Sequence, residues 1–174
     1  MLTSEPDVFL GPFSSPSARA TPWESALAVI AEAEVFWLST VRPDGRPHVT
    51  PLLAVWSLGG PCFTTGGQER KARNLERNPR CVLTTGTNAL NGVDVVIEGA
   101  AYRVDGRSER EQAVADFERK YGTHLTSSEG TWYGLGEAVV AGDVRLYRVE
   151  PTVGFAFGKL PTSSETRYAW PPRR

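Results

Sequence analysis

Residues 36–56 read FWLSTVRPDGRPHVTPLLAVW, and this stretch decides the fold class. Two runs rich in β-branched and aromatic residues flank the segment RPDGRP, which carries the proline, aspartate and glycine of a tight turn. The pattern predicts a hairpin of two antiparallel strands over residues 35–41 and 48–57. A hairpin favours an antiparallel sheet, because parallel neighbours need a long crossover connection.

Further strand-like segments follow at short intervals along the chain. They cover residues 61–65, 80–86, 93–105 and 143–158. Short helices are expected from the cap at Thr21 to about Ala33, and over 69–76 and 108–121; the first and last open on capping boxes, and a long loop is expected at 122–137. Because the strands cluster instead of alternating with long helices, the sequence predicts a mainly β (α+β) fold, a small antiparallel barrel of about six strands. The Gly99-Ala100 pair predicts a bulge or a bend of the barrel.

A chain of 174 residues is long enough for one domain with a substantial core. Residues 1–20 are rich in serine, proline and alanine, which predicts a flexible arm or an extended segment lying on a partner. The single barrel domain is expected over 21–160, followed by a polar, basic tail over 161–174. Trp37 and Trp56 fall in strands and are expected in the core.

Composition excludes several classes of protein. A net charge of −1 argues against a protein that coats nucleic acid, which needs a basic face. No apolar run approaches the roughly 20 residues of a membrane span, and the first residues do not resemble a secretory signal, so we expect a cytoplasmic protein without membrane contact. Cys62 and Cys81 are expected to be buried thiols, and two distant histidines make a metal site improbable.

Residues 63–79, FTTGGQERKARNLERNP, carry the strongest chemical signal. Thr64 and Thr65 end a strand, and two glycines then allow a ligand to approach the backbone. The following helix presents its free N–H groups to the same point, and its Arg70, Lys71 and Asn74 share one face. This pattern predicts an anion site. An ordinary turn and a solvated helix remain the alternative, because neither a Walker loop nor a GxGxxG fingerprint is present.

Taken together, FWLSTVRPDGRPHVTPLLAVW and CFTTGGQERKARNLERNPRCVLT resemble the pyridoxamine 5′-phosphate oxidase-like superfamily of split β-barrel proteins. The order of a first strand, a P-D-G turn, a P-H-V-T-P strand, a basic K-x-x-N-L helix and an N-P exit is the shared pattern. The late GFAFG and TRYAW segments are similar to an actinobacterial branch that uses coenzyme F-420 or FMN. The resemblance implies a six-stranded split barrel, a homodimer, and a non-covalently bound FMN or F-420 at the dimer interface.

The resemblance also implies which residues hold the cofactor. His48, Val49, Thr50 and Pro51 would line the flavin or deazaflavin ring, Thr64 and Thr65 would meet the ribityl or phosphate end, and Arg70, Lys71 and Asn74 would hold the phosphate. A basic groove for the acidic tail of F-420 has four candidates: Arg42, Arg46, Arg73 and Arg77.

The implied activity is hydride transfer from F-420 to a small unsaturated or quinone-like substrate, with an FMN-dependent oxidoreductase as the alternative. The segment that binds substrate in true pyridoxamine-phosphate oxidases is not recognisable, so synthesis of pyridoxal phosphate is not expected. A non-catalytic flavin or haem binder is a further alternative, in which His48 or His124 would ligate the iron. Catalytic residues stay open because the cofactor carries the hydride. Trp132 and Tyr133 are either a lid or interface anchors.

Overall fold

The computed structural model of the chain describes residues 5–171, which form nine strands and five helices. The strands are β1 (Asp7–Leu10), β2 (Phe36–Val41), β3 (Pro47–Leu52), β4 (Ala54–Ser57), β5 (Gly60–Thr65), β6 (Arg80–Thr85), β7 (Val93–Arg103), β8 (Arg145–Gly158) and β9 (Ser164–Ala169). The helices are α1 (Trp23–Glu32), α2 (Arg70–Arg77), α3 (Arg107–Tyr121), α4 (Thr123–Thr126) and α5 (Leu135–Ala141).

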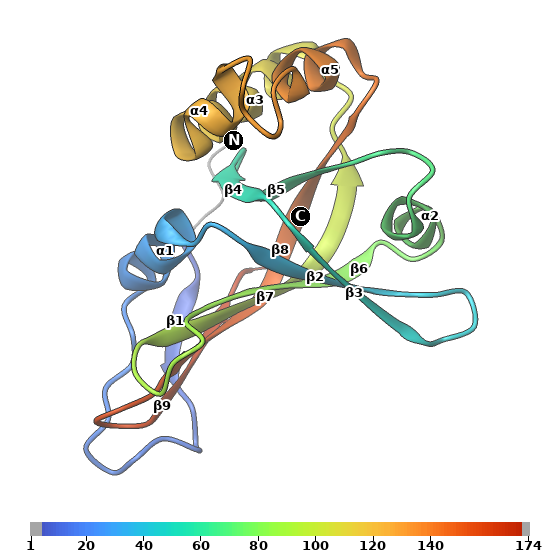
Figure 1. The fold of residues 1–174 in the computed structure, drawn as a ribbon. Coiled ribbons are helices and arrows are strands. Elements are labelled where there is room, and N and C mark those ends of the chain that lie inside the picture. Colours follow the sequence, from blue (N-terminus) through green and yellow to red (C-terminus); the bar gives the residue numbers. More distant parts are fainter. Residues whose placement is uncertain (1–4, 172–174) are drawn as a thin grey trace.

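Antiparallel pairing closes most of these strands into a barrel (Figure 1). Strand β2 pairs with β3 and β6, β6 with β7, β7 with β8, β8 with β5, and β5 with β4. Strands β3 and β4 together correspond to the predicted strand 48–57, which bends at Leu53 and passes from one partner to the other. Counted this way, the barrel has the predicted six strands, and the bend is where it splits.

Helix α3 satisfies the backbone at that bend. The Tyr121 hydroxyl accepts a hydrogen bond from the Ala54 amide at 3.0 Å and lies 2.9 Å from the Ala54 carbonyl oxygen. Lys120 Nζ donates to the carbonyls of Ala54 and Ile30, both at 2.9 Å. Buried peptide groups without a hydrogen-bond partner in a neighbouring strand need partners of this kind. Helix α3 therefore holds the chain in place where the barrel splits, and also covers that point.

Strands β1 and β9 extend the sheet beyond the barrel, and the sequence analysis missed both. Strand β9 pairs with β8, and β1 pairs with β9, giving the sheet order β1-β9-β8-β7-β6-β2-β3. The flexible-arm prediction is therefore wrong for residues 7–10, and the tail prediction is wrong for residues 164–169. The remaining ends of both segments, residues 1–4 and 172–174, lie outside the described part of the chain.

Two apolar cores hold the molecule together. One fills the barrel and includes Phe36, Phe63 and Tyr168, and the other lies between the barrel wall and helices α3–α5. Trp56 packs against the first core as predicted, but Trp37 is 52% exposed, which corrects its assignment to the core. The reason is strand alternation: Phe36 and Leu38 point inward, so Trp37 points outward.

The main difference from the predicted helices is that the segment predicted as a long loop is partly helical. Residues 122–137 contain α4 and the start of α5. Neither predicted capping box forms, because α1 and α3 begin at Trp23 and Arg107 without a side-chain cap. The predicted bulge is confirmed as a register shift between Glu98 and Gly99.

No helix within residues 5–171 combines the length and apolar character needed to cross a membrane.

Cys62 and Cys81 are free and buried, as predicted, and this gives stability a pH dependence. Burial raises the pKa of both thiols to about 12. Unfolded thiols ionise from about pH 8.5, so the unfolding free energy should fall by about 1 kcal/mol per thiol between pH 9 and 10. Urea unfolding at both pH values checks this. The double variant Cys62→Ala/Cys81→Ala should show a shallower fall, and an unchanged slope would contradict the assignment.

Candidate functional site

The predicted anion site lies where three elements meet: the end of β5, helix α2 and the β2–β3 hairpin (Figure 1). Thr65 ends β5, Gly66 and Gly67 connect it to α2, and α2 returns the chain to β6. Helix α2 covers Arg70–Arg77, one residue from the predicted 69–76, and ends at Asn78 before Pro79 as expected. The hairpin contributes Thr40 from β2 and His48 from β3.

Buried polar groups are concentrated at this corner. Seven polar or charged residues are buried within residues 5–171, and four of them lie here: Thr40, Thr65, Lys71 and Asn74. Lys71 is 8% exposed and Asn74 is 1% exposed. Burying a cation and an amide costs free energy unless partners compensate, so such a concentration indicates a ligand site more than a structural need.

A hydrogen-bond chain links three of the side chains. Asn74 Nδ2 donates to Thr40 Oγ1 at 2.9 Å, and Thr40 Oγ1 lies 3.4 Å from His48 Nδ1. Thr40 was missed in the sequence because it stands in an apolar run. Its position in the strand could have revealed it: Thr40 follows Phe36 and Leu38 at intervals of two residues, which places all three on the inward face.

Two buried polar atoms in this corner have no partner. Within the described residues, Arg42 Nε, Asn74 Oδ1 and Arg110 Nε are the buried side-chain atoms that lack a hydrogen bond. Exchanging the amide oxygen and nitrogen of Asn74 would still leave one of them unpaired, since only one reaches Thr40. An incoming ligand with several acceptors would satisfy Arg42 and, in that exchanged orientation, Asn74 as well.

Positive charge surrounds His48. Burial lowers the pKa of His48, and the charges of Arg42, Arg70 and Lys71 lower it further. The imidazole is therefore neutral near pH 7 and contributes a single N–H donor. A bound anion would reverse the charge contribution and raise this pKa, so His48 could take up a proton when the site fills.

The structure brings together most, but not all, of the predicted cofactor residues. His48, Thr65, Lys71 and Asn74 converge with Thr40 and Arg42, and Arg70 is exposed at the start of α2. We call the group Thr40, Arg42, His48, Gly66, Lys71 and Asn74 the anion cradle. Thr64 is half-buried and, by strand alternation, points away from Thr65.

The predicted ring-lining residues separate onto the two faces of β3. His48 and Thr50 are half-buried and share the face of Thr40, whereas Val49 and Pro51 are exposed on the other face. Of the predicted groove arginines, Arg42 is part of the cradle and Arg46 forms an ion pair with Asp44 at 2.7 Å. Arg73 donates to Gln68 at 2.9 Å, and Arg77 is exposed at the end of α2.

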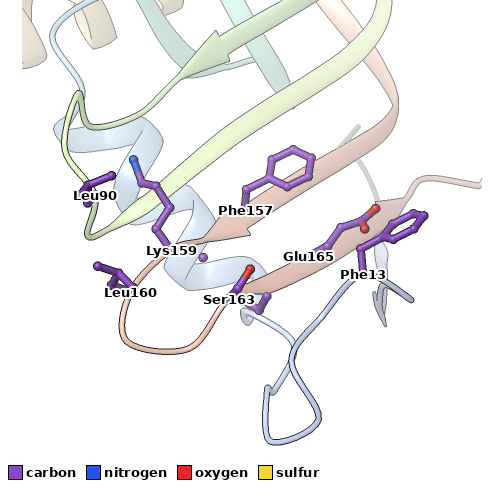
Figure 2. A pocket seen from close by; sticks show the side chains of 9 residues that line it. Phe13, Leu90, Phe157, Lys159, Leu160, Ser163 and Glu165 are labelled. Carbon is purple, nitrogen blue, oxygen red and sulfur yellow. The ribbon is translucent and has the colours of Figure 1, made fainter.

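Two cavities lie elsewhere on the barrel surface, and one of them is lined in part by Thr40. One has a volume of about 640 Å³ and lies beside the β8–β9 turn. Figure 2 shows Leu90 and Leu160 near Lys159 at one end of it and Phe13 beside Glu165 at the other. Another, of about 620 Å³, lies over the outer face of β2, β6 and β7 at the bulge and reaches Thr40. The second cavity continues the outer face of the hairpin, opposite the face that carries the side chains of Thr40 and His48, and Thr40 is the cradle residue in its lining.

The strand pairing assigns the protein to the class of split antiparallel β-barrels, and its buried polar corner suits an anion. The model of the family described as pyridoxamine 5′-phosphate oxidase matches residues 23–156. The chain therefore belongs to that family. A comparison with curated proteins found no match.

Solved structures agree on the fold. A conserved hypothetical protein of Mycobacterium tuberculosis has a TM-score of 0.64 at 18% identity, covering 79% of this chain and 85% of that one. A haem-binding protein of Mycobacterium smegmatis has a TM-score of 0.66 at 17% identity, covering 85% and 58%. The haem storage protein HutZ of Vibrio cholerae has a TM-score of 0.61 at 23% identity, covering 78% and 93%. At these identities the similarity concerns the fold alone.

Proposed function

We propose that this protein is an oxidoreductase that binds the phosphate of a deazaflavin, coenzyme F-420, in the anion cradle and reduces a small unsaturated or quinone-like substrate. The observation that carries the proposal is the buried, cationic and incompletely hydrogen-bonded corner formed by Arg42, Lys71 and Asn74. A phosphate offers several acceptor oxygens and negative charge, and so fits Arg42, Lys71 and, with its amide oxygen and nitrogen exchanged, Asn74.

The choice of F-420 over FMN rests on the charge of α2. Four of its eight residues are basic and one is acidic, and Arg70, Arg73 and Arg77 are exposed. An exposed basic helix beside the phosphate position would attract the acidic tail of F-420, which FMN lacks. FMN remains the alternative, because both cofactors present a phosphate to the cradle.

When bound, the cofactor supplies the hydride, and the protein supplies position and electrostatics. Lys71 and Arg42 neutralise the phosphate charge. Thr40 and Asn74 hold His48 on the same face of the hairpin, where its neutral imidazole carries one donor.

We also propose that two copies of the chain pair through the outer face of the hairpin. Trp37 and Val49 are 52% and 55% exposed, and the register places Pro51 opposite Trp37 and Pro47 opposite Val41 on the same face. A contiguous apolar face of this kind is typical of an interaction surface. It adjoins the cavity over β2, β6 and β7, whose lining includes Val41 and Pro47 of this face.

Val49→Asp should therefore weaken the dimer. A charge buried without a partner at an interface costs several kcal/mol, so we expect at least a ~100-fold higher dimer dissociation constant. Light scattering after size-exclusion chromatography gives the mass. Leu90→Asp is the matched control, since Leu90 is 80% exposed in a loop outside this face and should leave the dimer unchanged. A dimer that survives Val49→Asp would refute the proposed surface.

The cofactor itself is tested by separate titrations of F-420, FMN and haem, followed by fluorescence or the visible spectrum. Micromolar binding of F-420 and not FMN supports the proposal, and the reverse selects the FMN-dependent alternative. Binding of neither would exclude both enzyme assignments.

Haem binding without flavin binding would favour a non-catalytic binder, the second candidate. Two of the structural relatives are haem proteins by name. In this chain His124 is exposed on α4, contacts Trp132 edge-on, and lines a cavity of about 360 Å³ with Val35 and Leu53. It is thus the more accessible of the two histidines to an iron.

A further inference from the structure

The anion cradle already contains an anion of the protein itself. Glu69 Oε1 accepts a hydrogen bond from the Gly66 amide at 2.7 Å, and Glu69 Oε2 pairs with Lys71 Nζ. These are the loop amide and the buried ammonium that a phosphate in the cradle would use. The carboxylate of Glu69 thus takes the position of the expected ligand at two of its donors.

Glu69 is held there as a charged group. Burial acts to raise its pKa, but the hydrogen bonds from Lys71, Gly66 and Thr65 outweigh burial, and the pKa is lowered. The two partners differ in their freedom to move. The side chain of Lys71 is 10% exposed, whereas that of Glu69 is 50% exposed. Glu69 therefore has a path into solvent, while the ammonium stays in place.

We propose that Glu69 is an intramolecular competitor for the anion position, displaced most readily by a phosphate monoester. The inference rests on the proposed phosphate-binding function and adds a determinant of its selectivity. A phosphate monoester carries close to two negative charges and three acceptor oxygens, against one charge and two oxygens for a carboxylate. Exchange thus favours the monoester of FMN. The phosphate of F-420 also carries its acidic tail, so it is a singly charged diester and gains less over Glu69; this determinant therefore favours FMN, the alternative cofactor.

Further donors support the exchange. No side chain caps the N-terminus of α2, and buried Asn74 lies in the same helix. The unpaired atom of Asn74 is Oδ1, and exchanging the amide oxygen and nitrogen would make it the Nδ2 donor. Arg42 Nε also lacks a partner. Glu69, with two oxygens committed to Gly66 and Lys71, leaves these groups unsatisfied. A phosphate has a third oxygen to offer them.

A purely structural role for Glu69 is the competing explanation, because its bond to Gly66 also shapes the entry to the helix. Glu69→Gln separates the two roles. The glutamine oxygen still accepts from the Gly66 amide, so the turn is preserved, but the charge that competes for Lys71 is gone. A competitor predicts tighter anion binding in this variant, whereas a structural role predicts equal or weaker binding.

Glu76→Gln is a matched control on the same helix. Glu76 also forms one ion pair, with Arg145 Nη1 at 2.5 Å, and its side chain is 52% exposed. The two variants therefore remove the same charge at similar exposure, and only Glu69 lies in the cradle. General loss of negative charge would raise anion affinity in both variants equally.

The experiment measures binding of inorganic phosphate, FMN and riboflavin to the wild type and both variants, by calorimetry. Glu69→Gln should bind phosphate and FMN about tenfold more tightly, with riboflavin, which lacks the phosphate, unchanged; this corresponds to one charge-assisted contact. Glu76→Gln should match the wild type. Phosphate affinity that is unchanged, reduced or undetectable in Glu69→Gln would overturn the proposal.

The measurements with inorganic phosphate distinguish a failure of the Glu69 proposal from a failure of the proposed cofactor. If phosphate binds more tightly to Glu69→Gln but no flavin or deazaflavin binds any variant, the competitor is supported and the cofactor assignment fails. If flavin binds the wild type with equal affinity in Glu69→Gln, the cofactor assignment stands and the competitor fails.

Discussion

Lys71→Ala should weaken binding of F-420 or FMN by about 1.5–3 kcal/mol, or ~10- to 150-fold, because it removes a charge-assisted contact. Lys71 is the buried cation of the cradle, and its side chain is only 10% exposed. Removing it leaves Glu69 without its charged partner, and that carboxylate then repels the phosphate. Both effects act in the same direction.

Lys159→Ala is the matched control for this variant. Lys159 also forms an ion pair, with Asp94 at 3.0 Å, and its side chain is 22% exposed, but it lies at the β8–β9 turn. Titration followed by fluorescence, with circular dichroism to confirm folding, gives the comparison. Equal cofactor affinity in folded Lys71→Ala and wild type would show that the phosphate binds elsewhere.

Trp23→Ala should lower the free energy of unfolding by about 3–5 kcal/mol, as is typical for a buried aromatic residue replaced by alanine. Trp23 begins α1 and is 7% exposed. Its ring lies 5.2 Å from Trp56, 5.0 Å from Tyr168 and 5.1 Å from Trp170, in edge-on contacts. The substitution thus leaves a cavity where α1, β4, β9 and the segment after β9 meet.

Urea unfolding followed by circular dichroism measures this loss without depending on tryptophan fluorescence. Trp132→Ala serves as the control, since Trp132 is 41% exposed and an exposed side chain away from the core contributes about 0.5 kcal/mol or less. A loss below ~1 kcal/mol in Trp23→Ala would mean that the aromatic cluster does not stabilise the barrel.

Local patterns in the sequence were sufficient for the barrel and for much of the cradle. The turn at residues 42–47, the helix ending before Pro79 and the bulge at Gly99 each depend on a few adjacent residues whose conformational preferences agree. Lys71 and Asn74 could be placed together because helical spacing puts them on one face.

What the sequence could not supply depends on contacts between distant residues. Strand β1 pairs with β9 some 160 positions away, and neither segment has a distinctive local pattern. Thr40 reaches Asn74 across 34 positions. Trp37 was misplaced because an apolar run was treated as wholly buried, although its alternation with Phe36 and Leu38 places it outside. Glu69 was overlooked because its effect depends on where the side chain points.

The most direct measurement is the structure of the protein crystallised with whichever of F-420 and FMN it binds. We expect the cofactor phosphate within hydrogen-bond distance of Lys71 Nζ and the Gly66 amide, with the Glu69 carboxylate turned into solvent. A phosphate bound at another place, with the pair between Glu69 and Lys71 intact, would contradict the assignment of this corner as the cofactor site.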